Sequence, residues 1–251
     1  MKIKYFDITQ AALSIKCKLY SMDAHRFSHV VISVHGFGGS KDNNATQKLA
    51  ETLLPVHKDA AILSFDLPCH GSDVKQKLDL EDCSRYLDTV VQYAGETLQA
   101  EHLLGFATSF GGYLLLKHLH DKGNPFDKIL LRCPAVSMYD ILLRDIEKSG
   151  QAALLPKKDA VLGFDRKIRI PARFLDQLRE NDLNQWDFSE FTDSLLILHG
   201  TKDELVSHDM VEAFANAKGI DFLSIENADH RFREPSKMRE VLDYTMELFF
   251  G

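Results

Sequence analysis

Four short runs of the chain are apolar almost without interruption. They cover Val30 to Val34, Ala61 to Phe65, His102 to Ala107 and Leu195 to Leu198, and a shorter run covers Ile129 to Leu131. Strands that helices cover on both faces of a sheet show this pattern, because neither face meets water. These runs therefore predict parallel strands in the middle of a sheet.

Segments with the helical spacing of apolar residues separate these runs. They are Ala45 to Leu54, Leu80 to Leu98, Tyr113 to Leu119, Met210 to Ala217 and Met238 to Phe249. Strands and helices in alternation are typical of an α/β fold with right-handed crossovers. We therefore expect a mostly parallel central sheet with helices on both faces.

Two further strand patterns complete the predicted sheet. Apolar and polar residues alternate from Leu13 to Tyr20, which indicates a strand with one buried and one wet face. The segment from Lys2 to Ile8 is expected to pair with it. A last strand is predicted from Phe222 to Ile225, just before the C-terminal helix.

The stretch from Pro134 to about Glu190 breaks the alternation, because it contains no clear strand of the main sheet. Apolar spacing there indicates two amphipathic helices, one around Ile141 to Ile146 and one around Phe174 to Leu178. Structureless loops of this length are rare in compact domains. We therefore expect a small cap (134–190) inserted after the sixth strand of a core formed by 1–133 and 191–251. Its aromatic residues are candidates to line an acyl or aryl pocket, and they are Tyr139, Phe164, Phe174, Trp186 and Phe188.

The composition limits which binding partners and which cellular compartment are expected. The 251 residues include 30 basic and 37 acidic side chains, a net charge of −7, so a phosphate-backbone binder is not expected. No apolar run approaches the roughly 20 residues of a membrane span, and the first residues do not resemble a signal peptide. The 4 cysteines form no C-x-x-C pair, which favours reduced thiols over a disulfide scaffold or a zinc site. We expect a cytoplasmic monomer or homodimer.

The segment from His102 to Tyr113 carries the clearest chemical signal. A buried strand ends, Ser109 follows, and a helix begins at once. In a nucleophile elbow the serine sits on a strained strand-to-helix turn that lifts its hydroxyl above the sheet. The residues two before and two after the serine must be small, and here they are Ala107 and Gly111. Ser109 is therefore a candidate nucleophile.

A glycine-rich turn, His35 to Ser40, follows the first buried strand. It fits neither G-x-G-x-x-G nor G-x-x-x-x-G-K-[ST], so a nucleotide-binding α/β protein is disfavoured. Such a turn can instead expose a backbone N–H to a developing oxyanion, and acyl transfer uses two donors of this kind. The candidate donors are the amides of Phe37 and Phe110.

A serine nucleophile needs a base and an acid that orients the base. His230 lies after the last predicted strand, in a loop that can cross the top of the sheet. Asp203 follows the run Leu195 to Leu198 and is the candidate acid, with Asp140 as the alternative. Asp229 is discounted because adjacent side chains diverge, and Asp66 is interpreted as a structural turn residue. The other histidines considered lie in predicted loops (His25, His29, His57), on a helix (His118, His120), in a strand (His199) or on glycine turns (His35, His70).

Five blocks of the sequence together resemble the α/β-hydrolase superfamily over essentially the whole chain. They are HGFGGS from His35, FDLPCHGS from Phe65, ATSFGG from Ala107, HGTKDELV from His199 and ADHRF from Ala228. Within it, the short insertion and the last block resemble cinnamoyl (feruloyl) esterase-like carboxylesterases. Two positions depart from the usual pattern, since Ala107 replaces the first elbow glycine and Cys69 replaces a glycine before His70.

The resemblance implies Ser109 as nucleophile, His230 as base and Asp203 as acid, with Phe37 and Phe110 as oxyanion donors. It implies a serine hydrolase that cleaves small acyl or aryl esters through an acyl-enzyme, without metal or organic cofactor. Thioesterase, monoacylglycerol lipase-like, peptidase or acyl-transfer activity stays open, because a triad does not define the leaving group. A non-catalytic ligand-binding protein of the same fold is the alternative from another class.

Overall fold

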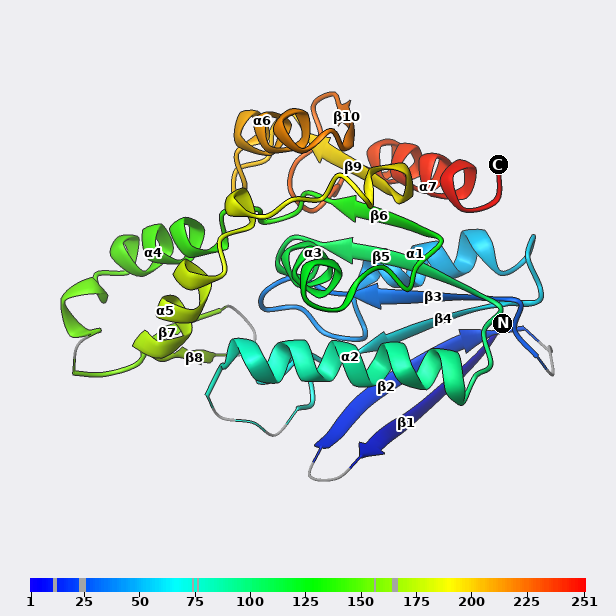
Figure 1. Ribbon diagram of the computed structural model, residues 1–251, viewed down its shortest axis with the longest axis horizontal. Helices are drawn as coiled ribbons and strands as arrows, with labels where there is room; N and C mark the ends of the chain where they lie inside the picture. Colours follow the sequence, from blue (N-terminus) through cyan, green and yellow to red (C-terminus); the bar gives the residue numbers. More distant parts are fainter. Residues whose placement is uncertain (11–12, 23–25, 74, 76, 156, 164–166) are drawn as a thin grey trace.

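An eight-stranded sheet forms the centre of the protein (Figure 1). The computed structural model describes residues 1–10, 13–22, 26–73, 75, 77–155, 157–163 and 167–251. The strands in spatial order are β1 (Lys2–Gln10), β2 (Leu13–Ser21), β4 (Ala60–Phe65), β3 (His29–Val34), β5 (His102–Thr108), β6 (Lys128–Arg132), β9 (Leu195–Gly200) and β10 (Asp221–Ile225). The pairs β1–β2 and β2–β4 are antiparallel, and the remaining pairs of this sheet are parallel.

The burial of the strands follows the sequence patterns that predicted them. Every residue of β4 is buried, as expected for a strand with helices on both faces. β1 is exposed along most of its length, because it forms one edge of the sheet and pairs only with β2. The predicted α/β architecture is therefore confirmed, including the pairing of the first two strands.

Five helices cover the two faces of the sheet: α1 (Asn44–Leu53), α2 (Leu80–Glu96), α3 (Phe110–Lys122), α6 (His208–Lys218) and α7 (Pro235–Phe250). Buried residues of α1 and α7 pack in one apolar cluster against one side of the strands. Buried residues of α2, α3 and α6 belong to a second cluster on the opposite side. The central strands lie between these clusters, which explains why their sequences are apolar on both faces.

The insertion between β6 and β9 contains more structure than its sequence indicated. The two predicted helices are present as α4 (Met138–Lys148) and α5 (Ala172–Glu180), with short 3₁₀ turns at Ala152–Leu154, Leu183–Gln185 and Thr192–Ser194. Between the helices, β7 (Ala160–Leu162) and β8 (Ile168–Ile170) form a separate antiparallel pair. Strands of three residues are too short to show a period in the sequence, which is why they were not predicted.

The aromatic residues of the insertion differ in what they contact. Phe174 and Phe188 are fully buried, so they pack in the core and do not line an open pocket. Trp186 stacks on His120 of α3, with ring centroids 4.0 Å apart. Phe164 lies outside the described residues. That the segment 134–190 acts as a cap stays a prediction.

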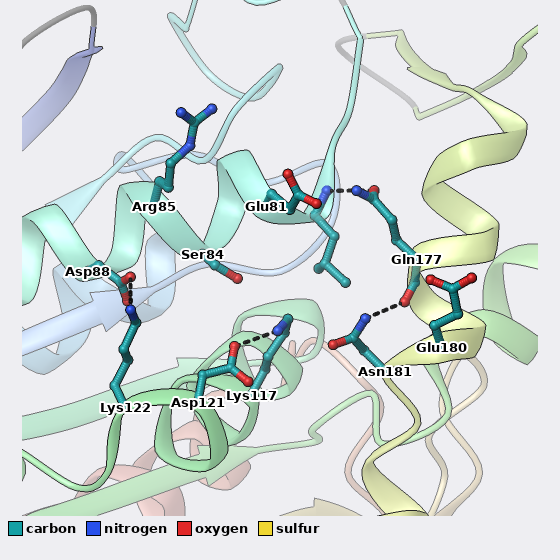
Figure 2. Close-up of a pocket in the computed structure, with 11 residues that line it drawn as sticks. Glu81, Ser84, Arg85, Asp88, Lys117, Asp121, Lys122, Gln177, Glu180 and Asn181 are labelled. Carbon is teal, nitrogen blue, oxygen red and sulfur yellow. Dashed lines mark hydrogen bonds and ion pairs between the residues drawn. The ribbon is translucent and has the colours of Figure 1, made fainter.

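Hydrogen bonds tie α5 to the first turn of α2. The buried side chain of Gln177 accepts a hydrogen bond from the backbone N–H of Leu80 at 3.0 Å. The same side chain donates to Asp79 at 3.2 Å, and Asp79 caps the N-terminus of α2. Figure 2 shows Gln177 reaching from α5 towards this turn. The insertion therefore completes the cap of a core helix, where unpaired N–H groups would otherwise be buried.

A polar groove lies beside this contact, between α2, the end of α3 and α5 (Figure 2). Its volume is about 380 Å³. Both acidic and basic side chains line the groove. Two of them, Lys117 and Asp121, form an ion pair at 2.5 Å. No residue that the sequence analysis singled out for chemistry lines this groove. It is therefore separate from the predicted site.

Two further expectations concern cysteines and membranes. All four cysteines are buried, and the structure pairs none of the four in a disulfide. Among the helices of the described ranges, none combines the length and the apolar character that a bilayer crossing requires.

We predict that Gln177→Ala destabilises the fold by about 1–3 kcal/mol, because it leaves the buried N–H of Leu80 without an acceptor. Thermal unfolding measures this, at roughly 2–4 °C per kcal/mol for a domain of this size. Glu180→Ala, on an exposed position of the same helix, is the control and is expected to change the melting temperature little. Equal melting temperatures for both variants would contradict the capping role.

Candidate active site

Ser109 stands on a strained turn between β5 and α3. Its backbone has φ 54° and ψ −117°, a conformation that residues with a side chain rarely adopt. The turn is held on both sides, because its N–H donates to the carbonyl oxygen of Arg132 at 3.0 Å. Its own carbonyl oxygen accepts from Gly112 at 2.9 Å and from Ala135 at 3.0 Å. The strand–turn–helix geometry expected of the sequence is therefore present, with a half-buried serine at its tip.

The turn packs closely against the loop after β3. A Cβ atom at Gly111 would lie 2.3 Å from the carbonyl oxygen of Val34 and 2.7 Å from that of His35. A Cβ atom at Gly36 would lie 3.0 Å from Cβ of Ser109. Any side chain at position 111 would thus collide with the backbone, so only glycine fits there, as the elbow pattern predicted. The glycine-rich loop and the serine turn are in direct contact.

The two candidate oxyanion donors lie on either side of this contact. Phe37 is in the turn closed by the hydrogen bond from Gly39 N–H to Gly36 O at 3.0 Å. Phe110 is the first residue of α3, and the two phenyl rings meet edge to face at 6.4 Å. Within the described residues, neither amide nitrogen has an acceptor among the hydrogen bonds. Both N–H groups are available, and their role as oxyanion donors stays a prediction.

His35 and Asp66 shape the loop on which Phe37 is placed. His35 donates from Nδ1 to the carbonyl oxygen of the next residue at 2.8 Å and accepts at Nε2 from Leu67 N–H at 3.1 Å. Burial lowers the pKa of His35 to about 4, so the ring is neutral at pH 7. Asp66 accepts from the backbone N–H of Lys41 and of Ser72, each at 2.7 Å. Both residues hold the loop in place, and the interpretation of Asp66 as a structural turn residue agrees with these contacts.

The side chain of Asp203 is fully buried after β9 and is surrounded by donors. Its Oδ1 accepts from the backbone N–H groups of Leu205 and Val206, each at 2.8 Å. Its Oδ2 lies 2.6 Å from Nδ1 of His230 and 3.2 Å from Nε2 of His199. Burial, the largest single influence, raises the pKa of Asp203, but the hydrogen bonds from His199 and His230 outweigh it and hold that pKa well below the ordinary value. Asp203 is therefore ionised at neutral pH.

The contact with Asp203 defines the tautomer of His230. Because an ionised carboxylate only accepts, Nδ1 of His230 carries the proton and Nε2 keeps its lone pair. The ring is almost buried, at 7% exposure. The alternative acid, Asp140, lies exposed on the first turn of α4 and is not the partner of this ring. Asp229 pairs with Arg233 at 2.7 Å, as its exclusion from the orienting role requires.

The loop that carries His230 reaches back across the sheet towards Ser109. In the strand order, β6 and β9 separate β5 from β10, a span of about 14 Å at the usual spacing of strands. The ring of Phe232, two residues beyond His230, lies 5.3 Å from the guanidinium carbon of Arg132 on β6. Arg132 in turn donates from Nε to Thr108 Oγ1 at 3.2 Å, next to Ser109. The base loop is thus held beside the serine turn.

The structure joins the predicted acid and base directly, and it joins the serine to neither. No hydrogen bond connects Ser109 Oγ with His230 within the described ranges. Hydrogen bonds between nucleophile and base are often long in the absence of substrate and tighten in the substrate complex. The functional role of the three residues together stays a prediction.

Cys133, His199 and Asp203 have potential ligand atoms within 4.8 Å of one another. Their chemistry does not fit a metal ion, because both carboxylate oxygens already accept hydrogen bonds. Burial also raises the pKa of the Cys133 thiol far above its ordinary value, so the thiol stays protonated and is a poor ligand. These side chains form a hydrogen-bonded support for the carboxylate.

Sequence reasoning missed the contribution of two residues. The sequence pattern predicts only that His199 lies in a strand, and the structure shows its imidazole on Asp203. Its separation of four residues from the acid, across the end of a strand, is a signal that could have suggested this contact. Arg132 also carries a signal in the sequence, because a charged residue directly after an apolar run is unusual in a buried strand.

Comparison with solved structures shows that the chain has the α/β-hydrolase fold. Est1E from Butyrivibrio proteoclasticus with ferulic acid bound is 20% identical and matches with a TM-score of 0.71, covering 94% of this chain and 97% of that chain. Alpha/beta hydrolase domain-containing protein 10 from mouse is 16% identical with a TM-score of 0.74, covering 98% of each chain. A putative hydrolase from Agrobacterium vitis is 14% identical with a TM-score of 0.77, again covering 98% of each. No protein-family profile and no curated protein sequence matches the chain.

We predict that Gly111→Ala destabilises the protein by at least about 1–3 kcal/mol, because its methyl group would collide with two backbone carbonyls that cannot turn aside. Gly95→Ala is the matched control. Gly95 lies in α2, a Cβ atom there meets nothing within 4 Å, and alanine stabilises a helix by up to about 1 kcal/mol. Melting temperatures should therefore move in opposite directions, and a shared direction would contradict the close packing at the serine turn.

Proposed function

We propose that this protein is a serine hydrolase that cleaves carboxylic esters through an acyl-enzyme intermediate. The observation that carries the proposal is the 2.6 Å contact between Asp203 Oδ2 and His230 Nδ1. It fixes a basic Nε2 on a loop that is held beside a serine on a strained turn. An alcohol, a carboxylate and an imidazole in this order along the chain are typical of α/β-hydrolases.

In the proposed acylation step, Ser109 Oγ attacks the ester carbonyl carbon while His230 Nε2 takes the hydroxyl proton. The carbonyl π electrons move onto oxygen and form a tetrahedral oxyanion. When the oxyanion collapses, the bond to the alkoxide breaks and His230 returns the proton to the leaving alcohol. Asp203 stabilises the imidazolium that exists between these two transfers and keeps its own charge throughout.

In the proposed deacylation step, His230 Nε2 takes a proton from water, and the hydroxide formed attacks the acyl carbon. Collapse of the second tetrahedral oxyanion breaks the bond to Ser109 Oγ, which regains a proton from His230. The available N–H groups of Phe37 and Phe110 are proposed to stabilise both oxyanions. A donor of this kind contributes on the order of 10²–10³ in turnover.

We propose small acyl or aryl esters, such as cinnamoyl-like esters, as the substrate class. Two observations support this class. Est1E, of the same fold, was solved with ferulic acid bound, and the half-buried ring of Phe37, which packs edge to face on the buried ring of Phe110, brings aromatic surface to the proposed oxyanion site. A panel of esters, thioesters and amides of graded acyl size tests the leaving group directly. Preference for thioesters or amides over all esters would overturn this part of the proposal.

We expect Ser109→Ala to lower hydrolysis of a short p-nitrophenyl ester by at least about 10³-fold, with little change in melting temperature. A fluorophosphonate probe should label the natural protein covalently and fail to label the variant. Ser84→Ala, on the flank of α2, is the control and should keep both activity and labelling. Retained activity or labelling in Ser109→Ala would eliminate this nucleophile, and an unlabelled natural protein would favour a non-catalytic ligand-binding role.

Asp203→Asn is expected to lower kcat by roughly 10⁴-fold, by comparison with the same change in a serine protease triad. An amide at this position donates as well as accepts, so it no longer holds the His230 proton on Nδ1. Asp140→Asn should leave kcat within about twofold, because Asp140 is exposed on α4. Steady-state kinetics of the two variants decide between the acids, and a larger loss in Asp140→Asn would reverse the assignment.

A further inference from the structure

Arg132 is a buried cation that the proposed mechanism does not use. It ends β6 with 6% of its surface exposed, and burial lowers the pKa of its guanidinium. Among the described residues, no carboxylate lies within ion-pair distance of it. A buried cation without such a partner loses hydration that hydrogen bonds to neutral groups replace only in part. Stability alone therefore gives no reason for an arginine at this position.

The contacts of Arg132 join two segments that the proposed chemistry must bring together. Nε donates to Thr108 Oγ1 at 3.2 Å, one residue before Ser109. The guanidinium lies over the ring of Phe232 at 5.3 Å, two residues beyond His230. Its remaining contact, from Nη1 to the Met238 sulfur at 3.6 Å, is to the first turns of α7. The side chain thus spans from the serine turn to the base loop.

The other contacts of the loop anchor it to the segment that follows β9. The backbone N–H of Asn227 donates to Thr201 Oγ1 at 2.8 Å, and Nδ1 of His230 lies 2.6 Å from Asp203 Oδ2. Phe232 has a left-handed backbone, with φ 52°, which has a conformational cost. The carbonyl oxygen of Ala228 accepts from Lys202 at 3.0 Å, but that bond joins the loop to β9 and not to β5. Among these contacts, only the guanidinium connects the loop to the strand that ends in Ser109.

We infer that Arg132 is a positioning residue, which holds the loop of His230 against the turn of Ser109 so that the imidazole reaches the hydroxyl. This inference rests on the proposed function. A cation–π contact of a desolvated guanidinium and a hydrogen bond to a hydroxyl are each strong enough to orient a short loop. A displacement of about 1 Å between reacting groups lowers rates by about 10²-fold, so a small shift of the loop is sufficient to matter.

Arg132→Met separates a positioning role from a structural role, because the two predict opposite changes in stability. Methionine has a similar length and removes the buried charge, and such replacements are often neutral or stabilising. We expect an unchanged or higher melting temperature and a kcat about 10–100-fold lower, with KM within about threefold. Fluorophosphonate labelling of Ser109 should slow by a similar factor, because it needs the same activation of the hydroxyl.

Lys117→Met is the matched control. Lys117 is also a buried cation, at 9% exposure, but it lies two turns along α3 and pairs with Asp121. It should leave kcat within about twofold, whatever its effect on melting temperature. Loss of kcat in both methionine variants would show that any buried cation has this effect, and it would overturn the inference.

Thr108→Val tests the same link without touching the buried charge. It removes the acceptor of Arg132 Nε, and we expect kcat to fall by about 3–10-fold at constant melting temperature. In the double variant with Arg132→Met, the loss should not exceed that of Arg132→Met alone, since both changes break one link. Multiplying losses in the double variant would overturn the inference. Full activity of Thr108→Val would overturn it even if Arg132→Met failed to fold.

The outcomes distinguish this inference from the function on which it rests. If the natural protein is labelled at Ser109 and Arg132→Met keeps its kcat, the positioning role is wrong and the proposed function stands. If the natural protein neither reacts with the probe nor hydrolyses esters, the proposed function is wrong. A parallel fall in melting temperature, kcat and substrate affinity in Arg132→Met would assign the residue to the fold and not to positioning.

Discussion

The approach of the serine turn to the loop after β3 is the contact on which the rest of the site depends. Only glycine at position 111 lets the turn reach the carbonyl oxygens of Val34 and His35, at distances that exclude any Cβ atom. That approach brings the Phe37 and Phe110 rings edge to face and leaves their amide nitrogens without acceptors among the described residues. The strained φ of Ser109 persists because backbone hydrogen bonds to Arg132, Gly112 and Ala135 hold it on both sides.

Parallel strands bring the candidate residues to one edge of the sheet, but they do not bring them into contact. β10 is separated from β5 by two strands, so the segment that follows it must cross β9. The buried guanidinium of Arg132 provides a fixed point where that crossing ends, between Thr108 and Phe232. The segment that carries Asp203 does not have to cross another strand, because two backbone N–H groups just beyond β9 already orient its carboxylate towards His230.

The insertion after β6 is joined to the core by polar contacts as well as by packing. Gln177 completes the cap of α2, and the hydroxyl of Tyr113 on α3 donates to the carbonyl oxygen of Asn181 at 2.8 Å. Phe174 on α5 packs edge to face on Phe110, with ring centroids 6.1 Å apart. Helix α5 therefore packs directly against the residue that follows Ser109, and a change in the position of α5 would displace the serine turn.

The sequence by itself determined the α/β architecture, because continuous apolar runs and small residues around a serine are local consequences of burial and of a tight turn. It also ranked Asp203 above Asp140, since Asp203 lies shortly past the continuous apolar run Leu195 to Leu198. It missed β7 and β8, which are too short to show a period, and it missed the roles of His199 and Arg132. The role of Arg132 depends on a contact between segments far apart in the chain, its guanidinium against the ring of Phe232. The role of His199 depends on how the chain turns after β9 and brings Asp203 to its imidazole. Tertiary structure alone decided these contacts, because a residue's own pattern reports whether it is buried and carries no information about which partner it meets there.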